Sequence, residues 1–275
     1  MRRHLTIGLL LATLGGLSHA EAQRPSIIGV LGITSEIAPI EQRLTDSREV
    51  SVRGFVFRQG SLGGVQVVVG RTGTGKVHAT IAATVLIDHF HPAAVFFSGT
   101  AGAVDPALNL GDVVIGTSVA HHDVGQQTPG GLQRRGPRHP TSGELDSVLL
   151  PAPDALVAAA RRAVRGLTLP PIGTTDGTTA TPRVVEGIIV TGEMFVANVA
   201  QREDLRKQLN AAAVEMEGAA VVQTCRYFEV PCLVVRSITD RADGGATTSY
   251  LTLRPRASEN AAAVVAAIIG KLDGR

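Results

Sequence analysis

Short apolar runs that end in glycine or in a polar residue recur along this chain and alternate with stretches of helical character. We predict strands over residues 26–32, 93–98, 112–120, 187–191, 213–214 and 230–238, and helices over residues 36–44, 76–89, 155–164, 202–209, 218–228 and 258–272. Strands that alternate with helices favour a largely parallel sheet covered on both faces. The expected fold is a single three-layer α/β/α domain with a mixed, largely parallel central sheet.

Two further segments differ from this alternation. Residues 50–57 and 63–70 predict a pair of strands joined by a glycine-containing turn. Residues 126–153 are rich in Gly, Pro and polar side chains and lack periodicity, which predicts a long loop. In a compact domain such a loop is usually a lid or an interface.

The composition supports one globular domain. The 275 residues include 44% hydrophobic residues, 31 Gly and no Trp, which suits a packed core of sheet and helices. The net charge is only +2, and the Arg-rich segment 133–138 fits a solvated loop better than a phosphate contact. Because no basic stripe is interleaved with aromatic residues, we expect no nucleic-acid partner.

The N-terminus has the pattern of a secretory signal. A basic start at residues 1–4 precedes an apolar run at residues 5–17, and residues 18–20 and 20–22 offer small-residue cleavage sites. We therefore predict a signal peptide at residues 1–22 and a mature domain at residues 23–275. The run is shorter than the ~20 residues of a membrane span, and a core strand or anchor helix is the alternative. We expect an exported, periplasmic protein without a membrane partner.

Only two cysteines occur in the chain, Cys225 and Cys232. Their spacing permits a disulfide, but one falls at a predicted helix end and the other in a predicted buried strand, which favours two packed thiols. No cluster of metal-ligating residues accompanies them. We therefore expect neither a metal site nor a cofactor.

The glycine-rich segment 70–76 has the composition of a phosphate-binding loop. A nucleoside-triphosphate loop ends in Gly-Lys followed by Ser or Thr, whereas Val77 follows Lys76 here. A tight turn that leads into a helix N-terminus is the better interpretation.

Acidic side chains stand at two predicted strand ends. Glu215 and Glu217 follow a short apolar run, and burial of both would require a cation or hydroxyl donors such as a ribose diol. An acidic helix N-terminus is the alternative. Asp240 ends an apolar strand, where shielding from water would raise its pKa and suit a general acid. A structural cap on the next turn explains Asp240 equally well.

Taken together, the order and spacing of several segments resemble the nucleoside phosphorylase and nucleosidase superfamily, and most closely the 5′-methylthioadenosine/S-adenosylhomocysteine nucleosidases. The segments are 28–32 (Ile-Gly-Val-Leu-Gly), 73–77 (Gly-Thr-Gly-Lys-Val), 98–102 (Ser-Gly-Thr-Ala-Gly), 111–114 (Gly-Asp-Val-Val), 122–124 (His-Asp-Val), 191–196 (Thr-Gly-Glu-Met-Phe-Val), 214–220 (Val-Glu-Met-Glu-Gly-Ala-Ala) and 236–240 (Arg-Ser-Ile-Thr-Asp). They span nearly the whole mature chain. The resemblance implies hydrolysis of the N-glycosidic bond of adenine-type nucleosides, with release of adenine and the free sugar.

The resemblance also implies which residues act on the base. Asp240 would protonate purine N7 and make the base a neutral leaving group, with Thr239 orienting its carboxyl. Phe195 would stack on the base. The backbone of Val196 would bond the adenine edge.

Other residues would act on the sugar and on water, the co-substrate. Met216 and Glu217 would hold the ribose hydroxyls, and Thr100 and Gly102 belong to a loop that lines the sugar and the attacking water. In the family a Glu shortly after the first strand holds this water. Glu36 fits that position if the loop is one residue shorter; otherwise Ile37 would occupy it, and another residue would have to act.

The sequence leaves three functions open. Phosphorylases of this superfamily bind phosphate with Arg residues just after the first strand and just before the segment that corresponds to residues 98–102. This chain has no Arg at either place, which favours hydrolysis. Arg71, from the neighbouring glycine-rich segment, could still reach the site. A phosphate-dependent purine nucleoside phosphorylase and a non-catalytic exported nucleoside-binding protein are the alternatives.

The resemblance implies a homodimer whose partner completes the pocket around the 5′ substituent. Residues 126–147 differ from the family there, and export would suit scavenging of external purine nucleosides.

Overall fold

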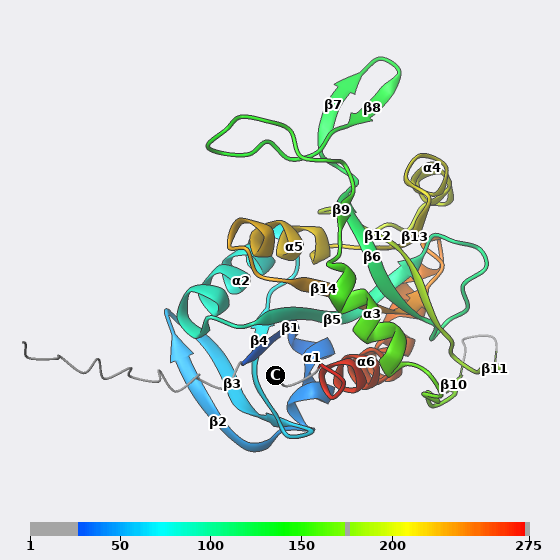
Figure 1. Cartoon of the computed structure of the whole chain (residues 1–275). Coiled ribbons are helices and arrows are strands. Elements are labelled where there is room, and N and C mark those ends of the chain that lie inside the picture. The colour runs from blue at the N-terminus through cyan, green and yellow to red at the C-terminus, as the bar shows by residue number, and fades with distance from the viewer. Residues whose placement is uncertain (1–26, 174–176, 273–275) are drawn as a thin grey trace, which may run out of the picture.

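The computed structural model describes residues 27–173 and 177–272, so the predicted signal peptide lies outside the described residues. Figure 1 shows the elements arranged around one large sheet. The helices are α1 (Thr34–Glu41), α2 (Lys76–Phe90), α3 (Asp154–Ala163), α4 (Val199–Leu209), α5 (Gly218–Tyr227) and α6 (Ala246–Ile269). The strands are β1 (Ile28–Ile33), β2 (Thr45–Val52), β3 (Phe55–Leu62), β4 (Val65–Thr72), β5 (Ala94–Ala103), β6 (Val113–His121), β7 (Gly125–Thr128), β8 (Gly131–Arg134), β9 (Leu150–Pro151), β10 (Ile172–Gly173), β11 (Thr179–Ala180), β12 (Val184–Thr191), β13 (Ala211–Glu215) and β14 (Cys232–Asp240).

The central sheet has the strand order β13-β12-β6-β14-β5-β1-β4-β3-β2, with β9 beside β6. β1 runs parallel to β4 and β5, and β14 runs parallel to β5, whereas β6 and β14 are antiparallel. β13 pairs with β12 and also with the end of β5, where Val214 lies opposite Gly102. The prediction of a mixed sheet is confirmed, and the ring β5-β14-β6-β12-β13 brings several strand ends to one place.

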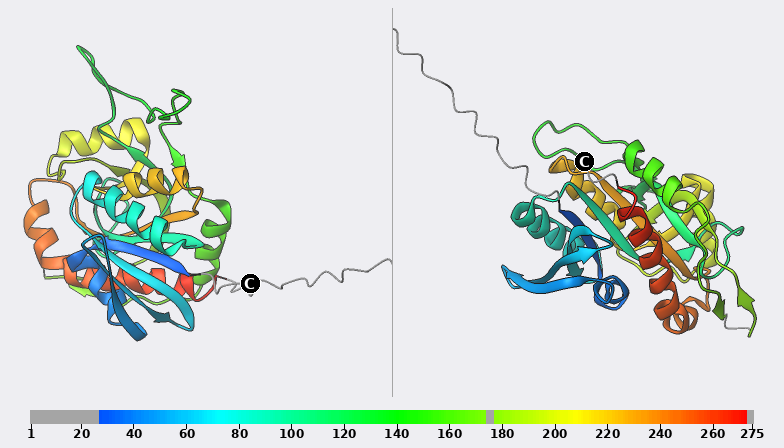
Figure 2. Two further views of the ribbon diagram at one scale, coloured as in Figure 1. Left: turned by 90° about the vertical axis from the view of Figure 1, so that its left-hand side faces the viewer. Right: turned by 60° about the horizontal axis from the view of Figure 1, so that its bottom comes forward.

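Helices cover both faces of this sheet. α2 packs beside α5 on one face, and α1, α3 and α6 pack together on the other (Figure 2). Side chains along a strand point alternately to the two layers. On β1, Ile28 and Val30 join the hydrophobic cluster with α1, α3 and α6, while Leu31 joins the cluster with α2 and α5. The sheet therefore has a hydrophobic core on each side, as a three-layer domain requires.

The prediction for residues 50–70 was wrong in detail, because three strands form where two were expected. A turn at Arg53 and Gly54 interrupts the predicted strand 50–57. The φ angles of these residues are positive, 50° for Arg53 and 83° for Gly54. Two consecutive residues of positive φ give the tight hairpin turn whose twist matches the flanking strands. A second such turn, at Gly63 and Gly64, separates β3 from β4.

The closing helix was predicted too short. α6 begins at Ala246 rather than at residue 258 and continues through Pro255. Proline inside a helix removes a hydrogen bond and costs about 3 kcal/mol. For this reason the helix was predicted to begin only after Pro255. Burial of Leu253 and Ala257 in the core offsets this cost. The correction matters because the added turns contribute to the site.

The segment predicted as a long loop contains some regular structure. β7 and β8 form a hairpin that projects from the body beyond β6 (Figure 1). Arg134 anchors its base, donating to the carbonyl of His122 at 2.7 Å, to Asp204 at 2.8 Å and to Gln208 at 2.8 Å. The rest of residues 135–149 is irregular apart from an isolated bridge between Arg138 and Leu145.

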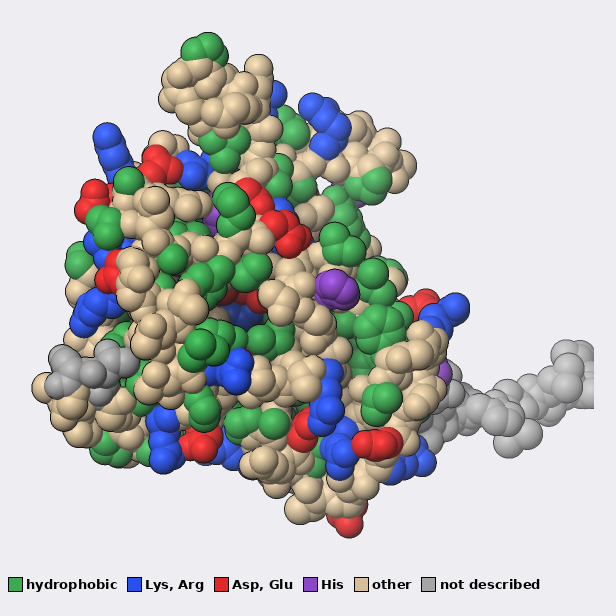
Figure 3. Space-filling model, turned by 180° about the vertical axis from the view of Figure 1, so that it is seen from behind, with side chains coloured by type: hydrophobic (Ala, Val, Ile, Leu, Met, Phe, Trp, Pro, Cys, Tyr) green, Lys and Arg blue, Asp and Glu red, His purple; other side chains and the backbone are tan. Residues whose placement is uncertain are grey.

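Three further observations bear on the predictions. Cys225 and Cys232 are buried free thiols, as the packed-thiol interpretation expected. Within residues 27–173 and 177–272, no helix is both long and apolar enough to cross a membrane. On the face seen in Figure 3, acidic and basic side chains are interspersed among hydrophobic ones rather than gathered by sign.

Candidate active site

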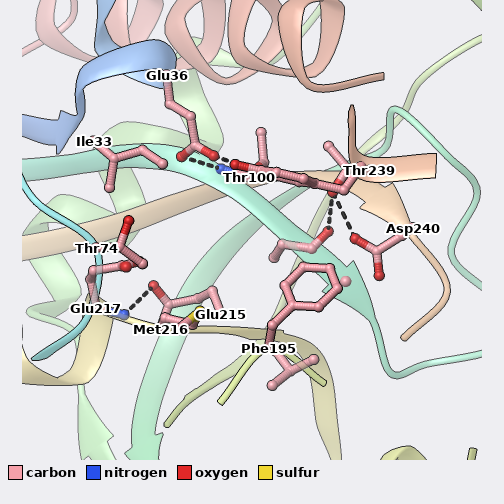
Figure 4. A pocket seen from close by; sticks show the side chains of 14 residues that line it. Ile33, Glu36, Thr74, Thr100, Phe195, Glu215, Met216, Glu217, Thr239 and Asp240 are labelled. Carbon is pink, nitrogen blue, oxygen red and sulfur yellow. Dashed lines mark hydrogen bonds between the residues drawn. The ribbon is translucent and has the colours of Figure 1, made fainter. Parts of the chain in front are cut away.

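A cavity lies where the carboxyl ends of β1, β5, β13 and β14 meet (Figure 4). The structure brings most of the predicted site residues to it: Glu36, Thr100, Gly102, Phe195, Met216, Glu217, Thr239 and Asp240. Val196 is buried and lines an adjoining space together with Phe195 and Met216. Ligand sites in such sheets form outside the carboxyl ends of the strands, so the position of the cavity follows from the topology.

Glu36 stands at the start of α1, with its carboxylate directed at the end of β5. It accepts hydrogen bonds from the backbone N of Thr100 at 3.0 Å and from the Thr100 hydroxyl at 2.5 Å. Burial raises the pKa of Glu36, and both Arg236 and Thr100 oppose that rise. Ile37 instead packs in the hydrophobic core, so the helix places Glu36 in the cavity.

Glu215, which lines the cavity, forms a buried ion pair with Arg236. The Nη2 atom of Arg236 lies 2.5 Å from Glu215, and the two side chains are only 1% and 2% exposed. Glu215 also accepts from the hydroxyl of Thr191 and from the backbone N of Glu217 and Gly218. These donors compensate the buried charge and fix the turn between β13 and α5.

That turn directs Glu217 into the cavity. Its Oε1 accepts a hydrogen bond from the backbone N of Gly75 at 2.8 Å, and its Oε2 lies 4.0 Å from Arg236. Burial, reinforced by the charge of Glu215, raises the pKa of Glu217 to about 8. The positive charge of Arg236 opposes this rise, as it opposes the rise at Glu36, so Arg236 is the cation shared by the glutamates around the cavity.

The glycine-rich segment contributes through its backbone. Gly75 has a φ angle of 90° and immediately precedes α2, as a tight turn before a helix N-terminus would. The backbone N of Lys76 donates to Glu193 at 2.9 Å, and its ammonium binds Asp123 at 2.7 Å. Carboxylates of the protein itself thus occupy the donors of this helix N-terminus, and the segment orients Glu217 instead of cradling a phosphate.

Asp240 ends β14 on the other side of the cavity. Its Oδ2 accepts from the hydroxyl of Thr239 at 2.8 Å, and its Oδ1 accepts from the backbone N of Ala242 at 2.9 Å. Burial raises the pKa of Asp240 and these two donors oppose the rise. A Cβ on Gly102 would lie 2.7 Å from the same carboxyl, so glycine is required there. A carboxyl with a raised pKa is suited to donate a proton.

No role was predicted from the sequence for several lining residues: Ile33, Thr74, Val214, Glu215 and Tyr250. Glu215 was noted for its charge but was given no role. Nothing in the sequence indicated Tyr250 as a site residue, because it lies in the part of α6 that was not predicted to be helical. Its ring meets Phe195 edge to face, with centroids 5.8 Å apart.

The cavity wall is acidic. Among the described residues that line it are four carboxylates, from Glu36, Glu215, Glu217 and Asp240, and no Lys, Arg or His. Arg71, considered above as a cation that could reach the site, is held by Glu41 through two hydrogen bonds of 2.9 and 2.6 Å. Across the described part of the chain, no group of three or more His, Cys, Asp or Glu could hold a metal ion.

Comparisons with known proteins agree with this geometry. The Phosphorylase superfamily matches residues 26–270. A 5′-methylthioadenosine/S-adenosylhomocysteine nucleosidase of Staphylococcus aureus is 33% identical over 248 residues, which cover 90% of this chain and 100% of the relative. The same enzyme from Neisseria meningitidis, solved with methylthio-immucillin-A, has a TM-score of 0.76 and 32% identity, covering 90% of this chain and 100% of that one. Futalosine hydrolase of Helicobacter pylori has a TM-score of 0.75 and 29% identity, covering 90% of this chain and 99% of that one. The chain belongs to the Phosphorylase superfamily.

Proposed function

We propose that this protein hydrolyses the N-glycosidic bond of adenine-type nucleosides with a 5′ substituent, such as 5′-methylthioadenosine or S-adenosylhomocysteine, and releases adenine and the free sugar. One observation carries the proposal. The cavity holds a carboxyl suited to donate a proton, Asp240, and a carboxylate suited to hold water, Glu36, and Glu217 and Met216 line the same cavity.

Each residue has a role in one balanced step. The bond from the sugar's anomeric carbon to the base breaks with its electron pair moving to the base, and Asp240 supplies the proton that neutralises the base. Glu217 accepts hydrogen bonds from the ribose hydroxyls and stabilises the positive charge that develops on the sugar. The water oxygen bonds to the anomeric carbon, and its proton passes to Glu36.

The acidic wall favours water over phosphate as the nucleophile. A phosphate ion would meet the carboxylate of Glu36 with no lining cation among the described residues to offset the repulsion. Arg236 lies near Glu36 and Glu217, but its guanidinium is already bound to Glu215. Arg71 would have to give up its pair with Glu41 to take part.

Base release separates the three candidate functions. In phosphate-free buffer, incubation with methylthioadenosine should yield adenine and the free sugar. Turnover that requires phosphate and yields the sugar 1-phosphate would identify a phosphorylase. Tight binding of nucleosides that remain intact would identify a binding protein.

We also propose that the protein is exported to the periplasm after removal of residues 1–22. The basic start and apolar run at the N-terminus support this. Fractionation of expressing cells, with the intact mass of the purified protein, tests it. A cytoplasmic protein that retains residue 1 would contradict it.

A homodimer is proposed through the outer face of α2 and α5. Val77 and Ile81 of α2 expose 66% and 45% of their surface there. They line a shallow hollow together with Val124 and Pro137, and with Ala220 and Gln223 of α5. Light scattering should give twice the chain mass, and Ile81→Glu should shift the protein toward monomer. A monomer at all concentrations would overturn the proposal.

A further inference from the structure

Two side chains in the early turns of α6, those of Tyr250 and Arg254, contact each other. Tyr250 lines the cavity, and Arg254 follows it by four residues, which places both on one face of the helix. The guanidinium of Arg254 lies over the Tyr250 ring, 5.4 Å from its centroid. The Tyr250 ring in turn packs against Phe195. The three side chains therefore form a continuous stack that ends in a cation.

The position of this stack relative to a bound nucleoside follows from the proposed function, on which this inference rests. Asp240 lies at one end of the cavity, and Ile33 and Thr74 lie at the other (Figure 4). With the base at Asp240 and the ribose on Glu217, the 5′ substituent extends away from Asp240. Tyr250 lines the main cavity together with Ile33 and Thr74 but does not line the adjoining space beside Asp240 and Val196, which places it toward the end away from the base.

Arg254 differs from the other charged residues of its helix. Arg256, two residues later, forms an ion pair with Glu259. Within the described ranges 27–173 and 177–272, no carboxylate lies within ion-pair distance of Arg254, although its side chain is only partly exposed. A guanidinium presents two parallel N–H donors that match the two oxygens of one carboxylate. A phosphate, with more charge, would be repelled more strongly by the acidic wall.

We propose that Arg254, stacked on Tyr250, selects nucleosides whose 5′ chain carries a carboxylate over nucleosides with an uncharged 5′ group. Arg254 is a specificity-determining residue in this scheme. It takes no part in bond cleavage.

The test compares kcat/KM for S-adenosylhomocysteine, its methyl ester and methylthioadenosine in the wild type, Arg254→Gln, Arg254→Lys and Arg256→Gln. Loss of a hydrogen bond to a charged group weakens binding by about tenfold or more. Arg254→Gln should therefore lower the ratio of kcat/KM for S-adenosylhomocysteine to that for methylthioadenosine by about tenfold, mainly through KM. The ratio for Arg254→Lys should fall between those of the wild type and Arg254→Gln. The matched control Arg256→Gln should keep the wild-type ratio.

The outcomes separate this inference from the proposed function. The inference is overturned, and the hydrolase stands, if the wild type releases adenine but Arg254→Gln lowers kcat/KM equally for all three substrates. The same holds if Arg254→Gln lowers kcat/KM for the methyl ester as much as for S-adenosylhomocysteine. If the wild type releases no base from any of the three, the proposed function itself fails. Thermal unfolding of each variant confirms that a changed ratio comes from folded protein.

Discussion

Both hydrogen bonds that Thr100 donates, from its backbone N and from its hydroxyl, end on the carboxylate of Glu36. The pair joins the first turn of α1 to the carboxyl end of β5. Because both bonds favour the ionised carboxylate, they hold Glu36 ready to accept a proton despite its burial.

Replacing Thr100 tests this relationship. Thr100→Val keeps the shape and the backbone donor but removes the hydroxyl, so the pKa of Glu36 should rise further. Glu36 must be ionised to accept a proton, so activity is lost as the pH falls through the pKa of Glu36. In the variant this loss of activity should begin at a higher pH. We expect kcat at neutral pH to fall about tenfold, which corresponds to about 1.4 kcal/mol. Thr100→Ser should retain the wild-type pH profile, and a valine variant with that same profile would contradict the role of the hydroxyl.

Asp240 should be indispensable for cleavage and much less so for binding. Asp240→Asn keeps the size of the side chain but cannot transfer the proton, and general acid catalysis contributes about 10²- to 10⁴-fold. We expect kcat for adenine release to fall by about that factor, while the Kd for methylthioadenosine, measured by calorimetry, changes by only a few fold. Asp88→Asn, on the exposed surface of α2, is the control. Retained turnover in Asp240→Asn would assign proton donation to another group.

Glu217 should make the ligand-free protein less stable as the pH rises. Its pKa is raised from 4.5 to about 8 on folding, so between these values the folded protein binds a proton that the unfolded chain does not. The free energy of unfolding then falls with rising pH in this window, by at most about 1.4 kcal/mol per pH unit for one group, and this contribution is constant outside the window.

Thermal unfolding from pH 5 to pH 8 measures this effect. Glu217→Gln cannot ionise and should flatten the decline, whereas Glu229→Gln, at an exposed site, should leave it unchanged. Equal slopes in the wild type and Glu217→Gln would show that other groups cause the decline. Burial also raises the pKa of Glu36 and Asp240, so part of the slope should persist in the variant.

Most of the site could be predicted because its motifs follow strands. Once the sheet is parallel around β5, the segments after β1, β5 and β14 must meet at one edge, so Glu36, Thr100 and Asp240 converge. The sequence could not decide between Glu36 and Ile37, since neighbouring helical positions differ by about 100° in direction. The packing of Ile37 against the core settles which one faces the cavity.

Tyr250 and Arg254 could not be found from the sequence for a different reason. Their helix begins after Gly244 and Gly245 and contains Pro255, and local propensity opposes a helix with these features. Tertiary burial of Leu253 overrides that propensity. The Arg53–Gly54 turn was missed likewise, because Arg-Gly lacks the Asn or Asp that usually marks such a turn.

Gly99 should be required because of how closely two charged groups approach it. A Cβ there would overlap the carboxylate of Glu36 and lie 2.7 Å from Nη1 of Arg236. Gly99→Ala should displace both groups and lower kcat about tenfold or more, with a loss of stability of about 1–3 kcal/mol from overpacking. Gly244→Ala has open space around the added carbon and should change neither. Wild-type turnover in Gly99→Ala would show that Glu36 does not need its observed position.

The two Arg–Glu pairs at Arg236 and Arg256 offer a direct comparison of burial. The Arg236–Glu215 side chains are 1% and 2% exposed, whereas those of Arg256 and Glu259 are 50% and 45% exposed. Arg236→Met leaves the buried carboxylate of Glu215 without its cation, which should lower the free energy of unfolding by about 3–5 kcal/mol. Arg256→Met removes a screened surface pair and should cost about 0–1 kcal/mol. Urea titration of both variants measures the difference, and equal losses would mean that the buried pair contributes to stability no more than a surface pair does.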